Sequence, residues 1–278
     1  MLIKATQEDI EQYMELAYSL AMDQTRSGYP LFSDGISTKG QFTDHVWRGY
    51  AASDSDILLF VMDGAVEGWI QFFRIEQDRY LQTTGFLINN NTEQALTEFM
   101  EYAGEHFPGY DLYLGFPKKN SRAIAFLQKD GSLPVEEAYH DIFLFHESVV
   151  LPRPAGLVKV AEDNFSAFRE IYQVDEDTYW TPERIFASLS QWRIYLLYRD
   201  GKAMGYVCAR DGEIYSLGCR DNVFDKSTYT ALVTAILRDL QAAGYTHMVF
   251  FNEEESQQAA LDMGFTCAAE YVLYVKSV

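Results

Sequence analysis

The sequence predicts a mixed α/β protein built from two similar domains in tandem. Residues 57–75 read as two alternating strands joined by a turn at Asp63-Gly64, and residues 194–210 repeat this pattern around Asp200-Gly201. Glycines recur at a constant offset of 137 residues within these hairpins and of 133 residues beyond them. A chain of 278 residues gives each copy enough length to bury a core of its own. We therefore expect two domains related by duplication.

The first copy alternates between strand-like and helical periodicity in a definite order. Residues 89–91 (Asn-Asn-Asn) and 107–109 (Phe-Pro-Gly) punctuate it. The expected elements are a strand at 2–5, a helix from about Thr6, a second helical region through Phe42, Val46 and Trp47, the hairpin at 57–75, a strand at 80–88, a helix at 92–106, a strand at 111–116, a helix at 121–129 and a last strand at 140–146.

The second copy follows a stiff, non-helical connector at residues 151–154, Leu-Pro-Arg-Pro. This connector places the domain boundary, so we predict domains at 1–150 and 155–278. A helix separates the central strand of each copy from the next strand, which predicts that the two run parallel. The expected elements are a strand at 157–161, helices at 165–172 and 182–189, the hairpin at 194–210, a strand at 213–219, a helix at 227–243, a strand at 245–251, a helix at 255–263 and a strand at 270–276.

Composition narrows the class of protein. Hydrophobic residues make up 48% of the chain and aromatic residues 15%, which is typical of a globular protein. The net charge of −19 disfavours nucleic acid and anionic membranes and favours cationic ligands. The first residues show no signal-peptide pattern, and the longest apolar run, 57–62, is too short to span a bilayer. We expect a soluble cytoplasmic protein.

Cysteine and histidine do not predict a metal site. Cys208, Cys219 and Cys267 all lie in the second half and form no C-x-x-C pair, which argues against a disulfide framework and a thiolate site. Only His140 and His146 are expected on one strand face, six residues apart, which is too far for one metal ion. The prediction is no metal.

Two short motifs accompany the order of elements. Asn120, Ala123 and Gly131 keep the spacing of the pattern N-x-x-A-x-x-x-Y-x-x-x-G, and residues 254–265 end in Met-Gly-Phe. In these motifs and in its order of elements, the chain resembles the GNAT superfamily of acyl-CoA-dependent N-acyltransferases, with one copy in each half. The resemblance implies acetyl-CoA as co-substrate and an amine as acceptor.

The motifs that bind acetyl-CoA in the family are degenerate here. In the family a turn R/Q-x-x-G-x-G/A holds the pyrophosphate at a helix N-terminus. This chain has no glycine at the matching residues 224–229 or at 91–96, and the family's catalytic tyrosine is replaced by Leu127 and Ala260. In the second half Asp225 is expected to cap the helix with its own carboxylate, which would oppose phosphate.

We therefore expect CoA in the first half. Asparagines at 89–91 tolerate left-handed backbone and donate hydrogen bonds, and cations follow at 118–122. The competing explanation is an ordinary helix cap by Asn91 or Thr92 with Gln94 nearby. The candidate cofactor-binding residues are Phe86, Ile88, Asn89, Asn90, Asn91, Thr92, Lys118, Lys119, Asn120 and Arg122.

The central strand of the second half carries the candidate catalytic residues. Glu213, Tyr215, Leu217 and Cys219 are expected to alternate onto one face, which makes Glu213 a candidate base and Tyr215 a candidate proton donor. The alternative for Glu213 is a solvated carboxylate at a strand end. Tyr179 and Trp180, with acids at 175–177, are candidates to hold a cationic amine by charge and cation–π contact, against an alternative of core packing.

Two functions follow as hypotheses. The first is an acyl-CoA-dependent N-acetyltransferase acting on a small, cationic amine, as a monomer or homodimer without a nucleic-acid or membrane partner. The second is a non-catalytic, degenerate GNAT-like module that binds a small ligand, an acyl carrier or a protein partner. The ordered architecture favours the first, and the missing glycines and tyrosines favour the second.

Overall fold

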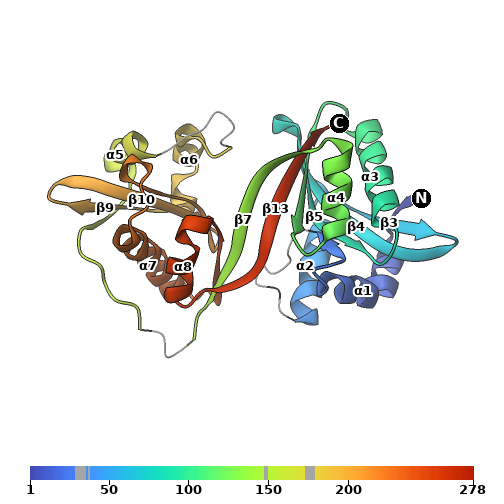
Figure 1. Ribbon diagram of the computed structural model, residues 1–278, viewed down its shortest axis with the longest axis horizontal. Coiled ribbons are helices and arrows are strands. Elements are labelled where there is room, and N and C mark those ends of the chain that lie inside the picture. Colours follow the sequence, from blue (N-terminus) through green and yellow to red (C-terminus); the bar gives the residue numbers. More distant parts are fainter. Residues whose placement is uncertain (29–35, 37, 147–149, 173–178) are drawn as a thin grey trace. The chain divides into compact units, whose positions relative to one another are not determined.

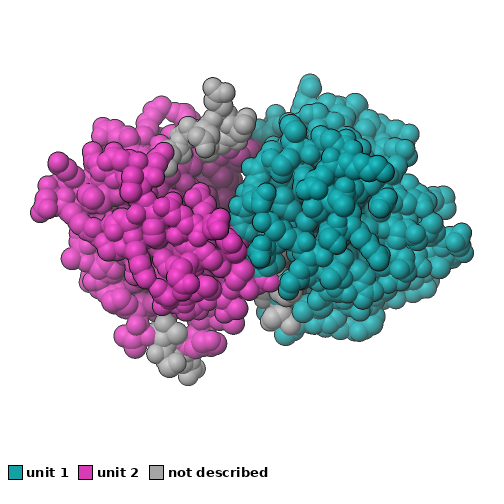
Figure 2. All heavy atoms as spheres, viewed as in Figure 1, with its two compact units in different colours: residues 1–138, 269–278 teal, residues 139–268 magenta. Residues whose placement is uncertain are grey.

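The computed structural model describes residues 1–28, 36, 38–146, 150–172 and 179–278. These residues form two compact units, drawn in different colours in Figure 2. Unit 1 comprises residues 1–138 and 269–278, and unit 2 comprises residues 139–268. The mixed α/β architecture predicted from the sequence is confirmed in both.

Unit 1 has a mixed sheet whose neighbouring strands are antiparallel except for one pair. That pair, β5 and β6, runs parallel, as predicted. Short strand β2 (Ser27–Gly28) also pairs with β5. The sheet order is β1 (Leu2–Lys4), β3 (Ser55–Met62), β4 (Ala65–Ile75), β5 (Tyr80–Ile88), β6 (Asp111–Pro117) and β13 (Thr266–Ser277).

Two helix pairs build two apolar cores in unit 1 (Figure 1). The first pair packs with Leu59 and Trp69, and the second with Phe86 and Leu114. The first two helices begin at capping boxes, at Thr6 and at Thr38, in which a side chain accepts from the third residue of the helix. The helices are α1 (Gln7–Ala21), α2 (Lys39–Ala51), α3 (Thr92–His106) and α4 (Ser121–Asp130).

Unit 2 repeats this plan. Its parallel pair is β11 and β12, again as predicted. The sheet order is β7 (Leu133–Leu144), β12 (His247–Asn252), β11 (Glu213–Cys219), β10 (Lys202–Arg210), β9 (Arg193–Arg199) and β8 (Leu157–Lys159). The helices are α5 (Phe165–Ile171), α6 (Pro182–Ala187), α7 (Lys226–Ala242) and α8 (Glu254–Asp262). Short 3-10 turns are η2 (Glu76–Asp78) in unit 1 and η3 (Glu162–Asn164), η4 (Leu189–Gln191) and η5 (Arg220–Asn222) in unit 2.

The two copies exchange their last strands. Strand β7, from the first copy, pairs with β12 from Tyr139↔Asn252 to Leu144↔His247. Strand β13, from the second copy, pairs with β6 from Tyr271↔Pro117 to Ser277↔Asp111. The compact units therefore differ from the contiguous domains 1–150 and 155–278. Because both last strands pair antiparallel beside equivalent strands, either one satisfies the same ladder of hydrogen bonds.

The bounds of β7 also differ from the predicted strand at 140–146. The strand begins at Leu133, and its residues are exposed through Glu137. Because no face of this stretch is buried, the sequence there lacks the alternation of apolar and polar residues that predicts a strand. It ends at Leu144, so His146 lies beyond it, while His140 is buried and stacks on Phe251 at 4.8 Å. Within the described residues, no helix combines the length and apolar character that crossing a membrane requires.

Candidate functional site

In each unit the two parallel strands pair over only a few residues, and the region between their carboxyl ends is called the crevice. Strands β5 and β6 pair only from Tyr80↔Asp111 to Gln82↔Tyr113. Strands β11 and β12 pair only at Glu213↔Val249 and Ile214↔Phe250. Beyond these residues β5 and β11 lead into α3 and α7, and β6 and β12 lead into α4 and α8. In open α/β sheets ligands bind in the crevice outside such carboxyl ends, so each unit presents one candidate site.

In unit 2 a carboxylate already occupies the helix N-terminus beside the crevice. Asp225 accepts hydrogen bonds of 3.2 Å from the backbone N–H groups of Ser227 and Thr228 and one of 3.1 Å from Arg199. The Thr228 hydroxyl, then the bonds from Ser227 and Arg199, lower the pKa of Asp225 to about 2. The predicted cap is confirmed, and the protein's own carboxylate occupies the positive end of the α7 dipole.

An aromatic ring fills the interior behind that helix N-terminus. Tyr229 is 1% exposed, and its ring lies 5.7 Å from Phe224 and 6.3 Å from Phe250, centroid to centroid. Burial raises the pKa of its hydroxyl, so the group stays neutral.

Glu213 and Tyr215 lie at the start of β11, beside a β-bulge. Ser216 opposes Cys208 and Ile214 opposes Ala209, so Tyr215 is the extra residue. Ile214 and Leu217 both pack on the core that contains Tyr229. Tyr215 instead contacts a separate group of rings.

The predicted single face of Glu213, Tyr215, Leu217 and Cys219 is therefore wrong beyond Tyr215, because the bulge shifts the alternation by one residue. Glu213 and Tyr215 are brought together. Desolvation by its neighbours raises the pKa of the Tyr215 hydroxyl although 40% of the residue is exposed, and the charges of Glu213 and Asp211 raise it further.

Indole rings and an arginine surround Tyr215. Its ring lies 6.0 Å from Trp180 and 5.4 Å from Trp192, in edge-on contacts. The guanidinium of Arg210 sits 5.4 Å from the Trp180 ring and 5.9 Å from the Trp192 ring. No sequence pattern indicated Arg210 and Trp192, because these contacts join separate elements. The candidate acids at 175–177 lie outside the described residues.

In unit 1 the helix N-terminus beside the crevice is not closed by its own side chain. Asn91 adopts left-handed backbone at φ 62°, as its residue type allows, and makes no side-chain cap. Its Nδ2 instead donates to the sulfur of Met62 at 2.8 Å. The alternative in which Asn91 caps α3 with its side chain is thus wrong. Thr92 is the first helical residue and is buried.

Most other predicted cofactor residues contact the protein itself. Asn89 and Asn90 donate to Glu67 at 3.0 and 3.1 Å, and Lys118 lies 2.8 Å from a carboxylate oxygen of Glu137. Phe86 and Ile88 are fully buried in the core, and Asn120 is 1% exposed. Lys119 and Arg122, at the start of α4, are exposed.

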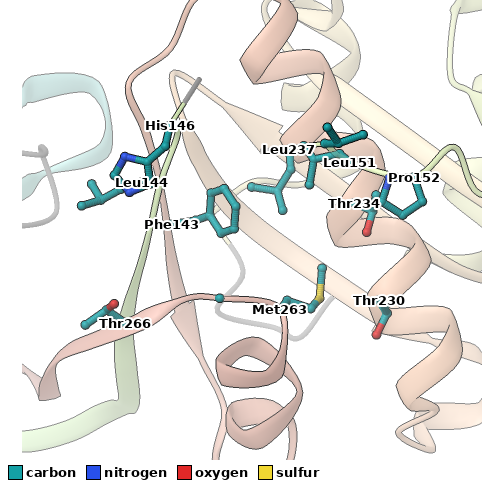
Figure 3. A pocket seen from close by; sticks show the side chains of 12 residues that line it. Phe143, Leu144, His146, Leu151, Pro152, Thr230, Thr234, Leu237, Met263 and Thr266 are labelled. Carbon is teal, nitrogen blue, oxygen red and sulfur yellow. The ribbon is translucent and has the colours of Figure 1, made fainter. Parts of the chain in front are cut away.

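A cavity of about 480 Å³ lies elsewhere in unit 2, between α7 and the segment that precedes β13 (Figure 3). Phe143 and Leu237 point toward each other across it. Thr230 and Thr234 add hydroxyl groups from one stripe of α7. None of the predicted site residues lines it, so this cavity is separate from the crevice.

By sequence, the chain matches no known family profile and no curated protein. Its structure resembles that of a tandem GNAT protein from the clavulanic acid biosynthesis pathway, solved without AcCoA. The TM-score is 0.54 at 15% identity, over 99% of this chain and 98% of the other. This chain has the tandem GNAT fold.

Other solved structures resemble this chain over nearly its whole length. A GCN5-related N-acetyltransferase from Sphaerobacter thermophilus gives a TM-score of 0.60 at 14% identity, over 99% of this chain and 95% of the other. A GNAT-family acetyltransferase from Colwellia psychrerythraea gives 0.50 at 10% identity, over 99% of both chains. The likeness therefore covers both units and is a likeness of fold.

Proposed function

We propose that this protein is an acyl-CoA-dependent N-acetyltransferase, with acetyl-CoA bound at unit 1. The contrast between the two helix N-termini carries the proposal. Helix α7 is capped by the Asp225 carboxylate, whereas α3 begins at an asparagine in left-handed backbone that makes no side-chain cap. Uncapped N–H groups and the helix dipole attract phosphate. Asn91, Thr92, Lys119 and Arg122 form the proposed phosphate site.

The proposed reaction transfers the acetyl group to an amine. The amine nitrogen attacks the thioester carbonyl carbon, a C–N bond forms and the C–S bond breaks. The amine loses a proton, and the CoA thiolate leaves and takes one up. Backbone N–H groups of the central strand stabilise the oxyanion of the tetrahedral intermediate.

Glu213 and Tyr215 are the candidate acid–base pair for the alternative in which transfer takes place in unit 2. The Glu213 carboxylate interacts with the Tyr215 phenol, whose raised pKa keeps it protonated at neutral pH. In unit 1 the matching positions hold Tyr80 and Gln82, whose side chains hydrogen-bond to each other. Transfer in unit 1 would therefore pass the amine proton to solvent.

The proposed acceptor is a small, cationic amine. The net charge of −19 attracts cations and repels acidic acceptors over the screening distance of about 8–10 Å. The Arg210 guanidinium over Trp180 and Trp192 supports this choice, because these rings already pack against a cation of the protein. In a panel of amines, polyamines should then react faster than glutamate-like acceptors, with thiol release as the readout.

Specific contacts also favour a second candidate, a non-catalytic binding module. The Asp225 carboxylate and the Tyr229 ring occupy the region of unit 2 where acyl-CoA would lie, and β2 pairs with the crevice edge of β5 in unit 1. A module of this kind would bind no acetyl-CoA at millimolar concentration.

Titration calorimetry with acetyl-CoA at low salt tests the proposal. Lys119→Glu combined with Arg122→Glu should weaken binding about tenfold, because two exposed cations become anions near the phosphates. The matched control is Lys226→Glu, at the start of α7, which should leave the affinity unchanged. The opposite order would move acetyl-CoA to unit 2.

A further inference from the structure

Strand β2 lies inside the crevice of unit 1. Ser27 and Gly28 pair with Leu87 and Phe86 of β5, and the Ile88 N–H donates to the carbonyl oxygen of Arg26 at 3.1 Å. These contacts fall beyond Gln82, the last residue at which β5 pairs with β6. The chain itself therefore completes the crevice edge of β5.

Two of the predicted cofactor-binding asparagines hold β2 in place. Asn120, at the start of α4, donates from Nδ2 to the carbonyl oxygen of Ser27 at 3.0 Å. Asn89 accepts from Nη1 of Arg26 at 2.9 Å, while Nε of the same guanidinium donates to Asp23 at 2.7 Å. Side chains from both walls of the crevice thus bind this segment.

The fit of β2 depends on a residue without a side chain. A Cβ atom at Gly28 would lie 2.5 Å from Cε1 of Phe116, on β6, and 2.9 Å from Cβ of Phe86, on β5. Both rings are fully buried. The segment is therefore matched in shape to the gap between the two strands, and a larger residue would push it outward.

We infer that residues 26–28 compete with acetyl-CoA for the crevice of unit 1, so that binding requires β2 to leave the edge of β5. This inference rests on the proposed function. A ligand with phosphates at the first turn of α3 must run along the end of β5, because only three residues separate Ile88 from Thr92. At that point the Ile88 N–H group already donates its hydrogen bond to the carbonyl oxygen of Arg26, so it is not available to the ligand. The site is thus self-inhibited, and its affinity depends on how firmly β2 is held.

Asn120→Ser tests this dependence while keeping a residue that caps α4. The variant loses the bond to Ser27, so acetyl-CoA should bind about fivefold more tightly, the factor for roughly 1 kcal/mol. Amide exchange of Ile88 should rise by a similar factor. Asn164→Ser is the matched control, since Asn164 donates a 3.0 Å bond to the carbonyl of Lys159 in unit 2. Weaker binding by Asn120→Ser would overturn the inference, because Asn120 would then be a ligand contact.

A disulfide gives a second, independent test. Ser27 and Leu87 are directly opposed, and antiparallel partners lie within the Cα separation that a disulfide spans. The Ser27→Cys, Leu87→Cys variant should bind acetyl-CoA after reduction and lose binding after oxidation. Equal affinity in both states overturns the inference but leaves the proposed function intact. If no form binds acetyl-CoA, although raised Ile88 exchange in Asn120→Ser shows that β2 has been released, the inference and the proposed function are both refuted. The cause is then the proposed function, because a released β2 cannot block the site.

Discussion

Asn120 and Ser27 are joined by a buried hydrogen bond of 3.0 Å, although 93 positions separate them in the sequence. The same asparagine accepts from the N–H of Ala123 at 3.3 Å and so begins α4. One side chain therefore fixes both a helix start and the short strand in the crevice. A residue predicted from the family spacing as a cofactor contact has a structural partner within the protein.

Asn120→Ala should destabilise unit 1 by about 2 kcal/mol, because it removes both bonds and leaves a buried carbonyl without its donor. Denaturant unfolding read from Trp47 and Trp69, which both lie in unit 1, measures the change. The transition of unit 2, followed at Trp180 and Trp192 in a protein with the other two indoles replaced, should not move. A loss below about 0.5 kcal/mol would mean that water replaces both bonds.

Asp225→Asn should destabilise unit 2 relative to the wild type, and the loss should be larger at neutral pH than at acid pH. The folded pKa of about 2 lies below the ordinary 3.8, so the carboxylate stabilises the fold fully above about pH 4. That contribution is lost as the pH falls through about 2. Unfolding of both proteins at pH 7 and pH 3 gives the difference, and a difference that grows on acidification would refute this account of the cap.

The repeated glycines have a steric cause. A Cβ atom at Gly68 would lie 2.1 Å from the carbonyl oxygen of Leu87, and one at Gly205 would lie 2.6 Å from that of Gly218. Gly68→Ala should therefore cost more than about 2 kcal/mol. Gly104→Ala, in α3 with open space around it, should instead stabilise by about 0.5–1 kcal/mol. Thermal unfolding compares the two, and equal effects would contradict the steric explanation.

Glu213→Gln tests the proposed acid–base pair. If transfer takes place in unit 2, kcat should fall about 100-fold with little change in KM, because a positioned base contributes on that order. The dependence of kcat on pH should flatten at the same time. Glu254→Gln, an acid in the first turn of α8, serves as a control. An unchanged pH profile in Glu213→Gln would remove Glu213 from the mechanism.

The sequence predicted what local patterns encode. Helical and strand periods located the elements, the intervening helices predicted both parallel pairs, and the residue type of Asp225 predicted its cap. The exchange of β7 and β13 carried no such signal, because each strand has the same pattern whichever partner it joins. The bulge at Tyr215 could not be predicted either, because a residue that is extra in the pairing looks like any other strand residue in the sequence.

Strand β2 could not be predicted for a different reason. It is two residues long, so it has no period, and its position depends on Asn120 and Phe116 from distant parts of the chain. The spacing around Asn120 indicated a family motif but not the partner of its side chain.

Amide hydrogen exchange of the full chain, with and without acetyl-CoA, tests the central claim most directly. Binding at unit 1 predicts protection at residues 92–94, in the first turn of α3, together with faster exchange at residues 27–28 as β2 leaves β5. Residues 226–228, where Asp225 already accepts the N–H bonds of α7, should not change. Protection confined to 226–228, or no change anywhere at millimolar acetyl-CoA, would contradict the account.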